Sequence, residues 1–293
     1  MEIPYKKIKR IVSDVMGPGI SDVVPLKKGM TNNSYIFTHG GSRYVLRLNG
    51  AGTGRLINRQ REVETYGAVS SYGISDEIIA IDADKGYKIT RFIENARNCN
   101  PYNGRDVKMC MEKLREFHEF KIKGNFIFDL YHTLEYYESL WKRKKSKYED
   151  YDVIKKRVYK LKPVLDTIDR KKFVLAHIDA VPDNFLMTNT GKVYLIDWEY
   201  AGMQDIYVDL AMFAIYTGYT KEETDRLIRL YFDGDCSDEI YWRIMAYEAV
   251  GGLLWSNWCE FKEDLGIYFD KYPETQYGYA KKYSEMALDM LRS

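Results

Sequence analysis

Short runs of β-prone residues alternate with polar turns in the first third of the chain. They cover residues 23–28, 34–38 and 43–48, and two more follow at 77–81 and 87–92. Gly- and Asn-rich segments separate the first three runs, and Asp84-Lys85-Gly86 separates the last two, as expected between strands. In the middle, apolar residues recur at helical spacing over residues 56–71. The pattern predicts a small lobe of strands with one helix.

The pattern changes after about residue 95. Charged amphipathic helices are predicted over residues 105–120, 134–145 and 153–168, and helices resume from residue 208 to the end. A hairpin interrupts them, with strands at 184–187 and 193–196 around the turn Asn189-Thr190-Gly191. We therefore expect an α+β protein with two lobes, a β-rich lobe of residues 1–93 and a larger helical lobe of residues 94–293.

Bulk composition excludes several classes of protein. Lys and Arg number 44 against 43 Asp and Glu, so the net charge of +1 favours neither nucleic acid nor an anionic membrane as partner. The first residues lack the apolar core of a secretory signal, and no apolar run has the length of a membrane span. Cys99, Cys110, Cys236 and Cys259 are scattered, which favours free thiols. We expect a cytoplasmic protein.

The candidate chemistry is concentrated between residues 177 and 199. His177-x-Asp179 is followed by Asn184, and Asp197 comes at the far end of the predicted hairpin. The hairpin should bring Asn184 and Asp197 together, and their oxygens suit Mg²⁺, which keeps several waters and needs few protein ligands. Asp179, on the preceding loop, could accept the proton of an attacking hydroxyl. His177 is expected to brace the loop, because one histidine alone makes a poor transition-metal site.

The residues between 177 and 199 resemble the catalytic segment of kinases, and this resemblance predicts a nucleotide site in the first lobe. The small polar segment at residues 27–34 could approach an anion through its backbone N–H groups, and it includes Asn32, Asn33 and Ser34. The resemblance also predicts a cation on the third strand and a helix carboxylate that holds it. Arg47 supplies the cation, and Glu62 is preferred to Glu64 as the carboxylate. The glycines at 50–54 are not a Walker A loop, because no Gly-Lys-Ser/Thr follows. Two exposed charges are the plain alternative for Arg47 and Glu62.

These segments together resemble the choline/ethanolamine kinase family, especially its bacterial LicA-type branch. The resemblance rests on LKKGMTNNSY at 26–35, VLRL at 45–48, TRFIE at 90–94, the segment 177–186 and IDWEYAG at 196–202. It implies the bilobal protein-kinase-like fold shared with aminoglycoside phosphotransferases. Val181 replaces the catalytic-loop lysine of protein kinases, and Trp198-Glu199 replaces their Phe-Gly, so a small-molecule substrate is expected rather than a protein.

The resemblance also implies roles for individual residues. Asp179 is the implied catalytic base, and Asn184 and Asp197 are the implied Mg²⁺ ligands, with Glu199 near the metal or substrate. Arg47 is expected to reach the phosphates of ATP, and the backbone at Arg91 and Ile93 to hold adenine.

A choline pocket is implied by aromatic residues late in the chain. Trp255 and Trp258 lie three apart on one face of a predicted helix. The other residues expected to form the pocket are Tyr200, Tyr279 and either Tyr216 or Tyr219. Aromatic faces attract a quaternary ammonium, which has no N–H to donate. Core packing is the plain alternative for such aromatics.

We therefore expect an ATP- and Mg²⁺-dependent kinase that converts choline to phosphocholine. Ethanolamine, thiamine or an aminoglycoside is the alternative substrate. A non-catalytic protein that binds choline or a nucleotide is a further alternative, which the presence of both Asp179 and Asp197 disfavours.

Overall fold

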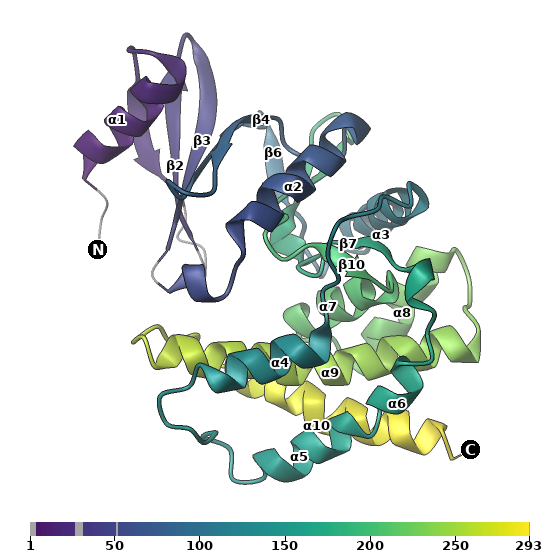
Figure 1. Ribbon diagram of the computed structural model, residues 1–293. Coiled ribbons are helices and arrows are strands. Elements are labelled where there is room, and N and C mark those ends of the chain that lie inside the picture. Colours follow the sequence, from purple (N-terminus) through teal and green to yellow (C-terminus); the bar gives the residue numbers. More distant parts are fainter. Residues whose placement is uncertain (1–3, 27–31, 51, 293) are drawn as a thin grey trace.

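The computed structural model describes residues 4–26, 32–50 and 52–292. Its first lobe is an antiparallel five-stranded sheet in the order β1-β2-β3-β5-β4, accompanied by two helices (Figure 1). The bounds of these elements are α1 Tyr5–Met16, β1 Ser21–Pro25, β2 Asn32–His39, β3 Ser42–Asn49, α2 Arg59–Val69, β4 Ile78–Asp82 and β5 Tyr87–Arg91. The predicted strands of this lobe are therefore all present, within a few residues of their expected bounds.

Helix α1 was not predicted. Ile8 and Val12, four residues apart and so on one helix face, are buried in the same apolar cluster as Phe37, Leu46 and Ile89 of the sheet. The helix thus covers one face of the sheet. The opposite face is left for the site.

The second lobe is mostly helical, with two small sheets near the junction of the lobes (Figure 1). Its helices are α3 Gly104–Glu119, α4 Leu130–Ser139, α5 Tyr151–Tyr159, α6 Lys162–Leu165, α7 Tyr207–Thr217, α8 Lys221–Phe232, α9 Asp238–Glu263 and α10 Tyr272–Met290. Its strands are β6 Ala96–Asn98, β7 Val174–Ala176, β8 Phe185–Thr188, β9 Val193–Leu195 and β10 Gly202–Gln204. The predicted hairpin is formed by β8 and β9.

Helix α9 forms the centre of this lobe. It is 26 residues long and most of its residues from Trp242 to Lys262 are buried, because α4, α7 and α10 pack around it. At Gly252 a Cβ atom would lie 2.6 Å from the carbonyl oxygen of Gln276 in α10. The absence of a side chain at this position therefore lets the two helices approach closely, which fixes the start of α10 relative to α9.

Two predicted helices have different bounds in the structure. The helix expected over 134–145 is α4, which begins four residues earlier and ends at Ser139. Asp129 explains the early start, because its side chain accepts a hydrogen bond from the amide of His132 and caps the helix. The helix expected over 153–168 is divided into α5 and α6, with Pro163 in the first turn of the second.

The two lobes share part of their packing. Leu56, Ile57, Tyr66 and Val69, all from the first 93 residues, belong to the large core cluster of the helical lobe. The division at residue 93 therefore stays a prediction. The four cysteines are free thiols. Within the described residues, every helix is too short or too polar to cross a bilayer.

Candidate functional site

A cavity of about 640 Å³ lies between the sheet and the helical lobe. Its walls include Arg47 from β3 and Thr90 from β5 on one side, and Asp179, Asn184 and Asp197 on the other. The predicted catalytic and nucleotide-binding segments thus meet in one place, although they lie far apart in sequence.

Asp179 lies on the loop that follows β7. The side-chain nitrogen of Asn184 donates to the main-chain carbonyl of Asp179 at 2.8 Å and to its carboxylate at 3.0 Å. Because the amide nitrogen of Asn184 is used in this way, its amide oxygen remains to accept from a donor or bind a cation. Burial, then the charges of Asp197 and Glu199, raise the pKa of Asp179 well above its ordinary value.

The loop is held by Asp209 of α7, a residue that the sequence analysis missed. Its carboxylate accepts hydrogen bonds from the backbone amides of His177, at 2.9 Å, and Ile178, at 2.7 Å. His118 of α3 lies 3.0 Å from the same carboxylate. Asp209 is fully buried, so these bonds set the loop conformation, including the left-handed φ of +66° at Ile178. No local spacing indicates this role, because Asp209 lies about 30 residues downstream.

His177 braces the loop as predicted. Its Nε2 lies 3.0 Å from the carbonyl oxygen of Ile196, which can only accept, so the ring donates from Nε2. The ring also packs against Trp198, with centroids 4.6 Å apart. Burial lowers the pKa of His177. A neutral imidazole therefore ties the loop that carries Asp179 to the hairpin that carries Asp197.

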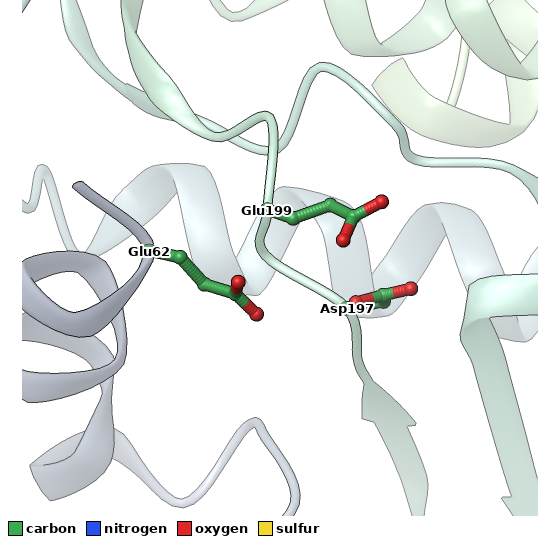
Figure 2. A group of neighbouring side chains, drawn as sticks. All are labelled: Glu62, Asp197 and Glu199. Atoms are coloured by element: carbon green, nitrogen blue, oxygen red, sulfur yellow. The ribbon is translucent and has the colours of Figure 1, made fainter. Parts of the chain in front are cut away.

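Three carboxylates gather where α2 faces the segment after β9. Oxygens of Glu62, Asp197 and Glu199 lie within 4.8 Å of one another, and Figure 2 shows the Glu62 side chain reaching toward the segment that carries the other two. Arg47 contacts all three carboxylates, including a 3.0 Å contact with Glu199. The predicted ion pair between Arg47 and Glu62 is present, and both side chains are almost fully buried.

Two further cations, both missed in the sequence analysis, belong to this group. Arg59 lies 2.8 Å from both Glu62 and Glu199. Its position three residues before Glu62, on the same helix face, was a usable signal. The second cation is Lys88 of β5, whose Nζ lies 3.5 Å from Glu62 and 3.6 Å from Asp197.

The ionisation of Asp197 follows from these cations. Burial opposes its charge, but Arg47, Lys88 and Arg59 outweigh burial and lower the pKa of Asp197 to about 2. Burial and the charge of Asp197 raise the pKa of Glu199. Glu199 accepts a hydrogen bond from Asn32 at 2.8 Å and contacts both arginines. Among the described residues Glu199 is not part of the cavity wall, so its role at the metal stays a prediction.

The donor set of the cavity fits Mg²⁺. Asn184 and Asp197 both line it and offer an amide oxygen and an ionised carboxylate, which are hard oxygen ligands. The φ of +67° at Asp197, unusual for a residue other than glycine, belongs to the backbone that places this carboxylate at the cavity.

Strand alternation separates the three polar residues predicted to approach the phosphates. The side chains of Asn32 and Ser34 line the cavity, whereas that of Asn33 points to the other face of β2, so a contact of Asn33 with the phosphates through its backbone N–H stays a prediction. Residues 27–31 of the same segment lie outside the described part of the chain. Arg91 and Ile93, predicted to hold adenine, both line the cavity.

Aromatic side chains line the helical side of the cavity. They are Tyr200, Tyr216, Trp255, Trp258 and Tyr272. Tyr200 stands edge-on to Trp255 at 5.3 Å between ring centroids, and its hydroxyl accepts a hydrogen bond from the indole nitrogen of Trp258 at 3.1 Å. Of the two tyrosines left open by the sequence, Tyr216 is at the cavity.

Tyr219 and Tyr279 were predicted in this wall, but neither is part of it in the described structure. The hydroxyl of Tyr279 donates to the carbonyl oxygen of Tyr219, and the hydroxyl of Tyr219 donates to that of Pro101, so both point into the helical lobe. Tyr272, in the first turn of α10, takes the place expected for Tyr279 and contacts Tyr216 at 5.8 Å. Sequence alone could not place the start of α10 against α9.

Comparison with known proteins identifies the family of the chain. A sequence model of choline/ethanolamine kinases matches residues 23–233. Protein LicA of Haemophilus influenzae strain ATCC 51907 is 26% identical over 256 residues, which cover 83% of this chain and 94% of that protein. A probable ethanolamine kinase of Arabidopsis thaliana is 26% identical over 269 residues, which cover 78% of this chain and 71% of that protein.

A solved structure extends the likeness to the fold. The crystal structure of choline kinase LicA from Streptococcus pneumoniae superposes with a TM-score of 0.84 at 28% identity, covering 96% of this chain and 98% of that one. The family match spans most of the chain. It gives a common explanation for the two lobes, the cavity and the residues gathered around it: the chain belongs to the choline/ethanolamine kinase family.

Proposed function

We propose that this protein transfers the γ-phosphate of ATP to the hydroxyl group of choline, with phosphocholine and ADP as products. Membership of the family supports ATP-dependent phosphorylation of a small alcohol. The observation that favours choline is the aromatic wall formed by Tyr200, Tyr216, Trp255, Trp258 and Tyr272. A trimethylammonium group gains roughly 0.5–2 kcal/mol from each such face, whereas ethanolamine would gain more from hydrogen-bond acceptors.

The residues of the cavity account for the transfer step. The hydroxyl oxygen of choline attacks the γ-phosphorus, the bond from phosphorus to the leaving oxygen of ADP breaks, and the hydroxyl proton passes to the carboxylate of Asp179. Asn184 keeps that carboxylate oriented through its 3.0 Å hydrogen bond. Arg47 supplies positive charge to the phosphates.

Mg²⁺ would be held by Asn184 and Asp197. When bound, the ion neutralises charge on the phosphates of ATP. Arg59 stays with Glu62 and Glu199 in this arrangement, because its guanidinium lies 2.8 Å from each.

An ATP-consumption assay with choline, ethanolamine, thiamine and kanamycin tests the proposal. We expect kcat/KM for choline to exceed that for ethanolamine by at least about tenfold, since several aromatic faces contribute. A preference for ethanolamine would replace choline as substrate but keep the kinase. Activity on kanamycin alone would refute an amino alcohol as the acceptor.

A further inference from the structure

Lys88 of β5 is a buried cation in the cavity wall that the proposed mechanism does not use. Its side chain is 6% exposed. Its ammonium group donates to the hydroxyl of Tyr66 at 2.5 Å and lies 4.4 Å from the centre of the same ring. It also lies 3.5 Å from Glu62 and 3.6 Å from Asp197. Burial of an ammonium is costly unless it is paired, so these four contacts need a reason.

The charges that are joined by ion pairs around Arg47 balance. The acidic members are Glu62, Asp197 and Glu199, and the basic members that contact them are Arg47, Arg59 and Lys88. Three negative charges thus face three positive ones. Nucleotide binding would alter this balance at two positions, because Asp197 would turn to the metal and Arg47 to the phosphates.

We propose that Lys88 is a positioning residue that keeps Glu62 paired when Arg47 turns to the nucleotide. This inference rests on the proposed roles of Arg47 and Asp197. With those two residues engaged, the buried carboxylates of Glu62 and Glu199 remain with Arg59 and Lys88, which is again a balanced set. Without Lys88, Glu62 would hold Arg47 more strongly, and Arg47 would then interact less with the phosphates.

Tyr66 explains why Lys88 stays in place. It lies on α2, one helical turn after Glu62, so its hydroxyl and ring fix the ammonium beside that carboxylate. Tyr66 and Glu62 thus hold the ammonium on the α2 side of the cavity wall. The geometry therefore favours a role through Glu62.

The test is a double-mutant cycle read out as the dissociation constant of Mg·ADP, measured by calorimetry. In the natural protein, Lys88→Met should weaken Mg·ADP binding by about tenfold or more. In the Glu62→Gln background, the same substitution should weaken it by less than about threefold. Lys88→Met also removes a cation next to Asp197, and this loss would by itself favour metal binding at Asp197. A weaker binding of Mg·ADP therefore cannot arise from the lost contact between Lys88 and Asp197.

Lys85→Met is the matched control, because Lys85 carries the same charge three residues away at the exposed β4–β5 turn. It should leave the dissociation constant unchanged within twofold. If Lys88→Met does not fold, Tyr66→Phe carries the same comparison, because it removes only the hydroxyl that accepts from Lys88. We expect Tyr66→Phe to weaken Mg·ADP binding two- to fivefold when Glu62 is present and less than twofold in the Glu62→Gln background.

Equal losses in the two backgrounds would mean that Lys88 acts independently of Glu62, and would overturn the proposal. An unchanged dissociation constant in Lys88→Met would overturn it as well. Failure of the natural protein to bind Mg·ADP would instead refute the proposed function on which the inference rests. The two kinds of failure are therefore distinguishable.

Discussion

At the scale of single residues, Asp179 has the surroundings that proton transfer requires. It faces the cavity, it is oriented by Asn184, and burial raises its pKa well above the ordinary value, which makes the carboxylate a stronger base. Asp197, which lines the same cavity, is kept ionised by Arg47 and Lys88. The pKa values of two aspartates in one cavity thus shift in opposite directions because their neighbours differ.

Replacement of Asp179 by Ala should lower kcat by about 10²–10⁴-fold, the usual contribution of a positioned base. The dissociation constant of Mg·ADP should change by less than about threefold, because the proposed nucleotide contacts come from other residues. Steady-state kinetics and calorimetry would measure the two effects. Asp235→Ala, a substitution of the same kind at an exposed position, should leave both values unchanged. Near-normal turnover in Asp179→Ala would show that the base is another group.

Tyr272 provides a test of the aromatic wall. Tyr272→Leu should raise KM for choline by about 3–30-fold through loss of one aromatic face, whereas Tyr272→Phe should stay within about threefold. KM for ATP should not move. Tyr279→Phe is the control, because the Tyr279 hydroxyl bonds within the helical lobe. A larger effect on KM for choline at Tyr279 than at Tyr272 would contradict the structural placement.

At the scale of secondary-structure elements, the contact between helices α8 and α9 contains a buried acid. Glu248 of α9 is fully buried, and Thr224 of α8 donates to its carboxylate at 3.1 Å. Burial raises the pKa of Glu248 to about 8. The carboxyl group is therefore neutral in the folded protein at pH 7.

This acid should make stability depend on pH. In the unfolded chain the pKa of glutamate is about 4.3, so between about pH 4.3 and 8 only the folded state holds the proton. The free energy of unfolding should then fall as pH rises through this window, by up to about 1.4 kcal/mol per pH unit.

Glu248→Gln should remove that slope, because the neutral amide keeps the acceptor for Thr224. Denaturant unfolding at pH 5.5, 7 and 8.5 would measure it. The exposed Glu285 of α10 provides the control, and Glu285→Gln should retain the slope of the natural protein. Parallel pH profiles for Glu248→Gln and the natural protein would contradict a raised pKa.

At the scale of the whole molecule, the site exists only where the two lobes meet. Arg47 and Lys88 come from the sheet, and Asp197 comes from the helical lobe, yet they form one group of charges. A ligand that binds this group therefore binds the folded, two-lobed protein and stabilises it.

Addition of ATP and Mg²⁺ at about 100 times the dissociation constant should raise the unfolding free energy by about 2.7 kcal/mol, which corresponds to an increase in Tm of about 5 °C. Excess EDTA should remove at least half of that increase, because Asp197 would lack its metal. Asp179→Ala should keep the increase, and Asp197→Ala should lose most of it. Thermal unfolding followed by circular dichroism would measure these shifts. An equal increase in Tm with and without EDTA would argue against a metal at Asp197.

The sequence by itself determined the strands of the first lobe and the residues with reactive side chains. Alternation and turns are local, and His177, Asp179, Asn184 and Asp197 are separated by short spacings that one loop and one hairpin convert into neighbours. The pair of Arg47 and Glu62 was also accessible, because a strand cation and a helix acid follow each other closely in the chain.

Only the tertiary structure decided which side chains face the cavity. Strand alternation turned Asn33 away, and the close crossing of α9 and α10 at Gly252 placed Tyr272, not Tyr279, at the aromatic wall. The supports of the site, Asp209 and Lys88, come from elements distant in sequence. Local patterns cannot indicate such contacts, because they depend on how buried surfaces pack and on how buried charges find partners.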